Sequence, residues 1–240
     1  MKKLLMLAIT FISVTSYAQP WKNIRGNGEM KKETRTVGDF NSLASYGAID
    51  VSISYGDSKN ITLEMDANLL PYIETTVENG KLTIRPKKHI NINSKSRMLV
   101  RVSMSKIASL QQSGSGNISG DGAFSNNGKT DIGLSGSGNI KLGFDHFDDL
   151  DLSVSGSGNI TLLNGKASNM ETRISGSGNI DCSKIECNDV TAKISGSGNV
   201  KVNAVKNIDA KISGSGNVFY KGNAANIKST IAGSGKLVKL

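Results

Sequence analysis

The stretch Ser113-Gly114-Ser115-Gly116-Asn117-Ile118 recurs through the second half of the chain and decides its fold. Further copies begin at Ser135, Ser155, Ser175, Ser195 and Ser213, and a diverged copy begins at Ala232. The steps between copies are 22, 20, 20, 20, 18 and 19 residues. A nearly constant period of this size is typical of stacked structural repeats, in which each repeat contacts only its neighbours.

Aligning the copies on their first serine places apolar residues in columns. The position before this serine holds Leu134, Val154, Ile174, Ile194, Ile212 and Ile231, and the position after the asparagine is Ile, Val or Leu. Each coil therefore has a strand on either side of the glycine-rich corner, and a variable loop forms a third side. Coils of about 20 residues with parallel neighbours predict an all-β fold, a right-handed parallel β-helix (β-solenoid). The left-handed form would show a small apolar residue every six positions, which this sequence does not.

The glycines and the asparagine of the motif have structural explanations. Glycine adopts positive φ angles and lets backbones approach closely at a sharp corner. Stacked asparagines are expected to hydrogen-bond from coil to coil, as amide ladders do in stacked parallel strands. We expect this ladder to contain Asn117, Asn139, Asn159, Asn179, Asn199 and Asn217. The motif thus predicts a scaffold, and specificity is expected where the repeats differ.

The first half of the chain alternates apolar and polar residues but shows no repeat motif. Ile49, Val51 and Ile53 share one face, and a turn at Asn79-Gly80 precedes another strand. Such alternation, bounded by Gly, Asn and Pro, indicates strands, with one helical turn near residues 67–72. We predict an extended segment at 19–44 and a single β-solenoid domain at 45–240. Its coils are irregular over 45–112 and regular over 113–240.

Residues 1–18, MKKLLMLAITFISVTSYA, have the pattern of a secretory signal peptide. Lys2 and Lys3 precede an apolar stretch, and Ser16-Tyr17-Ala18 forms a small-x-small cleavage site. No later stretch of the sequence is apolar for long enough to form a transmembrane helix. We therefore expect an exported protein in the periplasm, on the outer cell surface or secreted.

The charge of the chain is basic but scattered. The formal net charge is +9, which becomes +7 without Lys2 and Lys3 because 27 basic and 20 acidic residues remain. This charge is consistent with a solvated surface, and it also favours attraction to anionic glycan or membrane surfaces. Nucleic acid is not an expected partner, because an exported chain with 5% aromatic residues offers few rings for base stacking.

Cys182 and Cys187 lie five residues apart in one repeat. An exported chain can form a disulfide between such residues. However, Cys182 stands where other repeats have Leu142, Leu162 and Val202, which suits a small buried apolar side chain. Both alternatives remain open. With only two histidines in the chain, no zinc site is expected, and we predict neither a metal site nor a cofactor.

The densest polar cluster is the loop Asp145-His146-Phe147-Asp148-Asp149-Leu150-Asp151. Carboxylates at this density can hold a hard cation, but their spacing matches no known cation-binding loop. With the outward charges of neighbouring repeats they form a candidate binding surface. Its residues are Asp131, Asp145, His146, Asp148, Asp149, Asp151, Arg173, Lys193 and Lys211.

A polysaccharide-degrading enzyme, a pectin-type lyase or hydrolase, is the alternative function, because parallel β-helices often host this chemistry. It needs paired carboxylates, or a base beside calcium-binding acids, on one face. Only the Asp145–Asp151 loop could supply them, and the low aromatic content predicts no aromatic-lined groove for a sugar chain. Since fold analogy alone does not establish activity, we predict no catalytic residues.

Several separate motifs of the chain are shared with a known family. They are Trp21…Gly26-Asn27-Gly28…Arg35…Phe40, Ala48-Ile49-Asp50-Val51, Asn68-Leu69-Leu70, Asn79-Gly80-Lys81-Leu82 and the recurring SGSGNI. In this combination the chain resembles the "putative auto-transporter adhesin, head GIN domain" family (domain of unknown function 2807), which abounds in the Bacteroidetes. The resemblance implies a β-helical fold, export and an adhesive surface role, and it brings no catalytic residues.

We therefore predict an exported, non-catalytic β-solenoid that acts as an adhesin-like binding or structural module at the cell envelope. Its expected partner is a cell-surface glycan or an envelope protein. Assembly of copies through their coil ends into a homo-oligomer is a further alternative.

Overall fold

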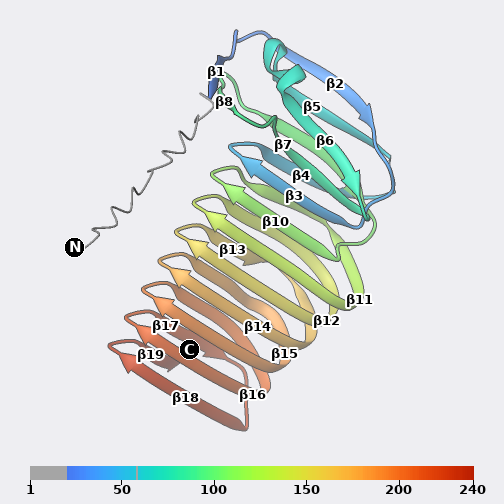
Figure 1. Ribbon diagram of the computed structural model, residues 1–240. Coiled ribbons are helices and arrows are strands. Elements are labelled where there is room, and N and C mark those ends of the chain that lie inside the picture. Colours follow the sequence, from blue (N-terminus) through green and yellow to red (C-terminus); the bar gives the residue numbers. More distant parts are fainter. Residues whose placement is uncertain (1–20, 58) are drawn as a thin grey trace, which may run out of the picture.

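The structure is a computed structural model that describes residues 21–57 and 59–240. The predicted signal peptide, residues 1–18, lies outside the described residues. Apart from one 3-10 turn, the described elements are strands, which form a 17-stranded sheet and a two-stranded sheet. Figure 1 shows parallel coils that wind in a right-handed sense below a mixed N-terminal sheet. The predicted all-β solenoid is confirmed.

The regular coils pair in parallel, each with the coil before it and the coil after it. Their strands are β10 (Ser109–Gly114), β11 (Ile118–Gly136), β12 (Asn139–Gly156), β13 (Asn159–Leu162), β14 (Gly165–Gly176), β15 (Asn179–Gly196), β16 (Asn199–Gly214), β17 (Asn217–Lys221), β18 (Asn226–Gly233) and β19 (Lys236–Lys239). Equivalent motif positions stand side by side, as in the pairs Ser135↔Ser155 and Ser155↔Ser175. The sequence repeat is therefore also the structural repeat.

Inward side chains form one continuous core along the solenoid. The column before the corner, from Leu134 to Ile212, is at most 3% exposed. Phe124, Phe144 and Phe147 fill the third side of the early coils, with successive ring centroids 5.6 and 4.2 Å apart. The two cysteines are buried in this core as free thiols. Cys182 thus occupies the core in the manner of the leucines and valine that replace it in other coils.

The glycine-rich corner leaves no room for a side chain that points toward the preceding coil. Gly176 has a φ of +124°, and a Cβ there would lie 2.5 Å from the carbonyl oxygen of Gly156. A Cβ at Gly178 would lie 2.2 Å from the carbonyl oxygen of Gly158. Because stacked strands are only about 4.8 Å apart, the corner requires glycine both for its conformation and for close approach.

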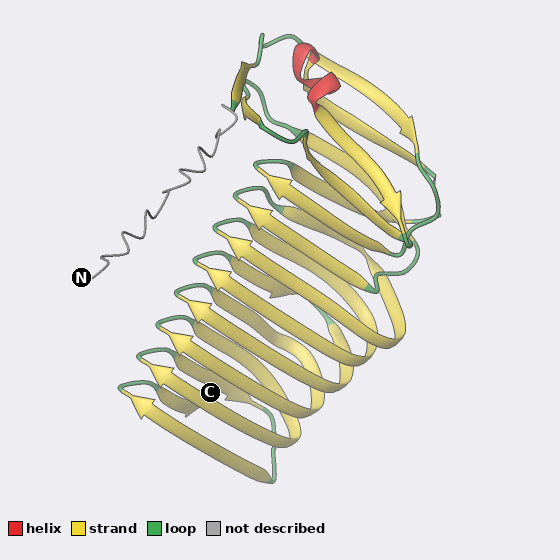
Figure 2. Cartoon of the chain, viewed as in Figure 1, coloured by secondary structure: helices red, strands yellow, loops and turns green. Residues whose placement is uncertain are grey.

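A mixed sheet caps the N-terminal end of the solenoid. Its elements are β2 (Met30–Thr36), β3 (Ser42–Gly47), β4 (Asp50–Tyr55), β5 (Asn60–Asp66), η1 (Ala67–Tyr72), β6 (Ile73–Glu78), β7 (Lys81–Pro86) and β9 (Leu99–Met104). The separate two-stranded sheet consists of β1 (Lys22–Arg25) and β8 (Ile90–Asn93). β3 and β4 pair in parallel with the first regular coil, whereas β2 pairs antiparallel with β5 and β6 with β7. η1, red in Figure 2, confirms the predicted helical turn. None of the described helices is long and apolar enough to cross a membrane.

Residues 45–112 carry no copy of the repeat motif, but one of their turns is built like the repeated corner. Tyr46 and Gly47 lie in register with Ser113 and Gly114 of the first clear copy. The Asp50 carboxylate accepts hydrogen bonds from the backbone N–H and the side-chain amide of Asn117, at 2.8 and 3.0 Å. Residues 46–51 are therefore a diverged corner. They escape notice in the sequence because only Gly47 and Val51 keep residue types found at these positions of the motif.

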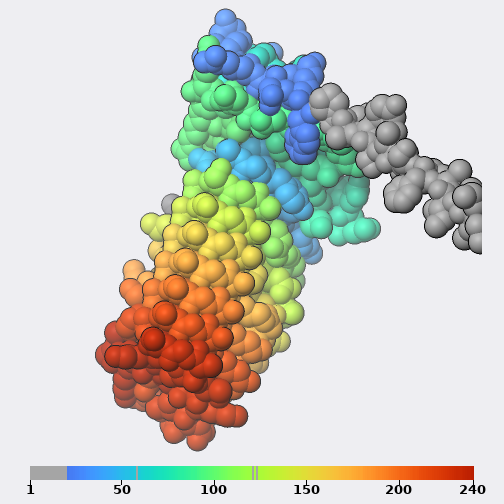
Figure 3. Space-filling model, turned by 60° about the vertical axis from the view of Figure 1, so that its left-hand side comes forward, coloured from blue at the N-terminus to red at the C-terminus, as the bar shows by residue number. Residues whose placement is uncertain are grey.

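β18 and β19 form the last coil, the red tip in Figure 3. Every residue of β18 is exposed, and Ile227 and Ile231 are 51% and 41% exposed. Lys236 replaces the ladder asparagine, and its backbone N–H still donates to Asn217 Oδ1 at 3.1 Å. A lysine at an exposed edge disfavours the addition of another strand.

Candidate binding surface

The corner asparagines form a hydrogen-bonded ladder along one edge of the solenoid. From Asn139 to Asn217, each side-chain amide donates to Oδ1 of the asparagine in the preceding coil, at 2.8–3.1 Å. An amide inside the ladder both donates to one neighbour and accepts from the other. The ladder thus ties coil to coil, and this edge of the molecule is a scaffold.

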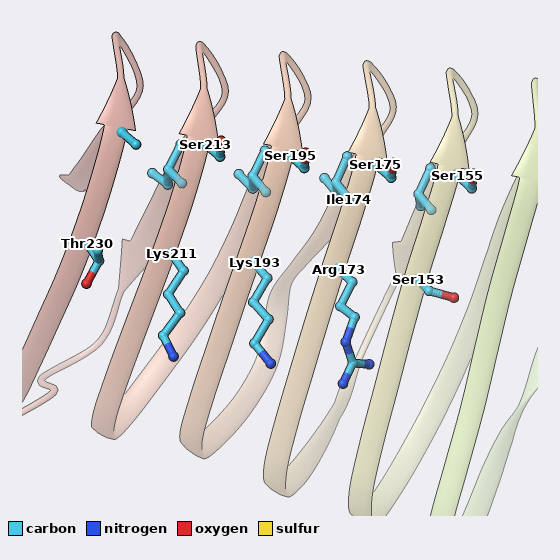
Figure 4. A pocket seen from close by; sticks show the side chains of 14 residues that line it. Ser153, Ser155, Arg173, Ile174, Ser175, Lys193, Ser195, Lys211, Ser213 and Thr230 are labelled. Carbon is cyan, nitrogen blue, oxygen red and sulfur yellow. The ribbon is translucent and has the colours of Figure 1, made fainter.

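A shallow groove of about 630 Å³ runs across several coils next to this corner. Figure 4 shows Arg173, Lys193 and Lys211 in a row on one side, with a row of serines on the other. The serines are Ser155, Ser175, Ser195 and Ser213. Between the rows lie Ile174 and its neighbours in register, whose side chains are buried. We call this feature the basic groove.

Two acids, Glu171 and Asp209, form ion pairs with the cations of the basic groove. Glu171 Oε2 lies 2.6 Å from an Arg173 nitrogen, and Glu171 also accepts a hydrogen bond from Lys193 of the next coil. Lys211 Nζ lies 3.7 Å from Asp209. Such half-exposed pairs contribute little to stability, so their main effect is to align the cations. Three cations against two carboxylates leave the row with a net positive charge.

Of the predicted acidic residues, Asp131 and Asp151 stand in register with Glu171, and Asp149 lies two residues before Asp151 in β12. A hollow of about 310 Å³ is lined by Asp149, Asp151 and Glu171, together with Lys129. Lys129 Nζ lies 2.8 Å from Asp151 and 3.6 Å from Asp131. The hydrogen bond and the charge of Asp151 raise the pKa of Lys129. Asp149 accepts a hydrogen bond from Asn169 at 2.8 Å. Asp149 and Asp151 are therefore both bonded to side chains of neighbouring coils.

The remaining predicted residues, Asp145, His146 and Asp148, line neither groove. They lie on the outer surface of β12, where His146 Nε2 is 3.2 Å from Asp148 Oδ1. Phe147 and Leu150, which interrupt them, are buried in the core. Within the described part of the chain, no group of three or more His, Cys, Asp or Glu is placed to hold a metal ion. Asp145, His146 and Asp148 therefore lie on an exposed strand surface, and only the second half of the loop, residues 149–151, lines a hollow.

The prediction that the chain has no aromatic-lined groove is wrong. A hollow of about 520 Å³ at the N-terminal end is lined by Trp21, Tyr46 and His89, and by the basic Arg85, Lys87 and Lys88. We call this feature the aromatic groove. Tyr46 occupies the position of the first motif serine, so the substitution of Ser by Tyr is the sequence signal for this groove. That signal becomes visible only once the register of β3 and β10 is known.

Comparisons with known proteins agree with this architecture. The family described as "Putative auto-transporter adhesin, head GIN domain" matches residues 39–224. A comparison with curated proteins finds no match.

Three crystal structures are similar over nearly the whole chain. A "putative adhesin" from Bacteroides fragilis has a TM-score of 0.81 at 19% identity, over 90% of this chain and 100% of that chain. A "putative lipid binding protein" from Parabacteroides distasonis has a TM-score of 0.75 at 24% identity, over 91% and 100%. A "putative adhesin" from Parabacteroides merdae has a TM-score of 0.74 at 25% identity, over 91% and 99%. The structures share the fold, and the family match spans most of the chain, so this protein belongs to the family described as "Putative auto-transporter adhesin, head GIN domain".

Proposed function

We propose that the protein is an exported, non-catalytic, adhesin-like module that binds an anionic component of the cell envelope in the basic groove. The observation that carries this proposal is the row of Arg173, Lys193 and Lys211 beside a row of serines. Guanidinium and ammonium groups attract anions, and the hydroxyls supply further hydrogen bonds to them.

The solenoid makes this row suitable for a repeating ligand. Its coils hold the cations at a fixed spacing of about 4.8 Å, and Glu171 links two of them across coils. A preorganised row loses little conformational freedom on binding. Several weak contacts along one polymer also add to a useful avidity. An acidic cell-surface glycan and the headgroups of anionic lipids both offer such repeating charges.

The contacts of the acids support adhesion rather than catalysis. Glu171 and Asp209 contact the cations, and Asp149 and Asp151 accept from Asn169 and Lys129. A glycan-cleaving enzyme instead needs two carboxylates on either side of one scissile bond. The family to which the chain belongs supports the same choice, because its description is that of an adhesin.

The test compares two triple variants of equal charge. The groove variant carries Arg173→Gln, Lys193→Gln and Lys211→Gln. The control variant carries Lys141→Gln, Lys184→Gln and Lys201→Gln, which lie outside the basic groove. Binding to immobilised envelope fractions, to purified acidic glycans and to anionic vesicles is measured by biolayer interferometry at low and at physiological salt.

We expect the groove variant to bind at least about tenfold more weakly and the control to stay within about twofold. The difference should shrink as salt is added, because exposed charges are screened. Equal losses in both variants would show that binding depends on net charge alone. Undiminished binding by the groove variant would place the site elsewhere.

A further inference from the structure

Two large aromatic side chains of the aromatic groove are exposed to solvent. This groove lies at the end of the molecule opposite to β18 and β19 (Figure 1). Trp21 is 66% exposed and Tyr46 is 43% exposed. The ring of His89 meets that of Trp21 edge-on, with centroids 6.0 Å apart. Water-exposed rings that line a hollow present flat apolar faces to a ligand, together with polar atoms at their edges.

The charge around these rings has one sign. Among the described residues that line the groove, Arg85, Lys87 and Lys88 are basic and none is acidic. Arg85 is held by Glu74, whose Oε2 lies 2.9 Å from Arg85 Nε. Lys87 and Lys88 are exposed in the turn before β8. The groove is thus complementary to a ligand that combines apolar faces with negative charge.

The backbone holds the groove in shape. β1 and β8 form a two-stranded parallel ribbon, in which Asn91 donates to Asn23 Oδ1 at 2.8 Å. His89 has a φ of +59°, and its carbonyl oxygen accepts a hydrogen bond from the Lys22 N–H at 2.9 Å. The Lys87 N–H is bound by the Tyr72 carbonyl oxygen at 2.8 Å. A residue kept in this sparsely populated conformation is fixed by its surroundings, so the site is preorganised.

The geometry points to a second binding site in the aromatic groove, which takes an acidic oligosaccharide. The C–H faces of sugar rings pack against Trp21 and Tyr46, and carboxylate or sulfate groups pair with Lys87, Lys88 and Arg85. A hollow of about 520 Å³ falls within the usual size range of small-ligand sites. A membrane is a poorer match, because these rings line a hollow beside Asn91 and His89 instead of projecting as an apolar face.

This site lies on the same outward column as the basic groove but at a distance from it. Tyr46 is followed in register by Ser113, Ser135 and then Ser155, where the basic groove begins. Three steps of about 4.8 Å separate Tyr46 from Ser155. The two grooves can therefore be altered independently.

The experiment uses Trp21 as the reporter, because it is the single tryptophan of the chain. Tryptophan fluorescence is titrated with a short oligogalacturonate, with a neutral galacto-oligosaccharide and with phosphatidylglycerol vesicles, and calorimetry supplies an independent Kd. The test variants are Tyr46→Ser, which installs the residue of the other corners, and the double variant Lys87→Gln with Lys88→Gln. The controls are Tyr55→Ser, an exposed tyrosine outside the groove, and Lys31→Gln with Lys81→Gln.

We expect oligogalacturonate to change the Trp21 emission and the neutral sugar to bind at least about tenfold more weakly. Tyr46→Ser should raise the Kd about fivefold, and the double lysine variant should raise it about tenfold at low salt. The controls should stay within about twofold.

Four results would overturn the inference. They are the absence of both an emission change and a heat signal, equal binding of the neutral sugar, a response to vesicles alone, and an unchanged Kd in both test variants. The triple variant of the basic groove is titrated in parallel. If it loses oligogalacturonate while Tyr46→Ser retains it, the sugar occupies the basic groove, and the proposed function stands without this second site.

Discussion

Replacing single glycines by alanine separates the two reasons for glycine in the corner. Gly176→Ala is unfavourable for both reasons, because φ is +124° and the new Cβ would lie 2.5 Å from the Gly156 carbonyl oxygen. Gly178→Ala is unfavourable mainly because of close approach, since its Cβ would lie 2.2 Å from the Gly158 carbonyl oxygen. Gly128→Ala is unfavourable only because of the backbone conformation, since φ is +126° and no atom lies within 4 Å of its Cβ.

The magnitudes follow from these contacts. Strain at a glycine-only conformation costs about 1–3 kcal/mol, which is the expected cost of Gly128→Ala. At Gly176 the Cβ also needs about 0.9 Å more room, the difference between the 3.4 Å of ordinary contact and the 2.5 Å present. The Gly156 oxygen accepts from Ser177 N and Gly178 N at 2.9 and 3.0 Å, and moving it weakens two hydrogen bonds worth about 0.5–1.5 kcal/mol each. Gly176→Ala should therefore cost about 2–6 kcal/mol.

The assay is equilibrium unfolding in urea followed by far-ultraviolet circular dichroism, with the m-value checked for constancy. We expect the free energy of unfolding to fall least for Gly128→Ala and most for Gly176→Ala. If these two variants agreed within about 0.5 kcal/mol, close coil stacking would not limit the corner. If Gly178→Ala were as stable as the parent protein, the 2.2 Å approach would be irrelevant to stability.

Three further predictions concern buried ionisable groups. Burial opposes the ionisation of Asp66, but hydrogen bonds from residues 94–96 outweigh it and lower the pKa. The ionised Asp66 therefore stabilises the fold above its unfolded-state pKa, and this stabilisation is lost as the pH falls through its folded-state pKa. As the pH is lowered from about 4, the melting temperature should fall less steeply in Asp66→Asn than in the parent protein. Burial also raises the pKa of both thiols, that of Cys187 to about 12, so a thiol reagent at mildly alkaline pH should label them only after unfolding. Cys182→Val should cost less than about 1.5 kcal/mol and Cys182→Ser about 1–3 kcal/mol in urea unfolding, and the reverse order would contradict an apolar role.

The regular coils could be predicted because each feature that defines them repeats. The apolar residue before the corner, the two glycines and the asparagine each recur at one coil spacing. In stacked parallel strands equal positions become neighbours, so a sequence column is also a spatial column. The ladder from Asn139 to Asn217 follows from the same reasoning.

The candidate binding surfaces could be predicted only where their residues occupy equal positions of successive repeats. Arg173, Lys193 and Lys211 belong to one column, and the structure places them in one groove. The acids of the Asp145–Asp151 loop are close in sequence, but in a strand their side chains alternate in direction, and the partners of Asp149 and Asp151 belong to other coils. Density of charge along the chain therefore did not indicate a shared pocket.

By itself the sequence determined the solenoid, its coil length and its corner, because these depend on local conformation repeated at a regular interval. Only the tertiary structure decided that Tyr46 stands in the serine column, and that Trp21 and His89 meet beside it. These residues come from three non-repeating segments, namely the residue before β1, β3 and the turn before β8. Their proximity depends on how the N-terminal sheet packs onto the first coil, which no period in the sequence encodes. The SGSGN corner builds the rod, and the aromatic groove lies where the repeat is broken.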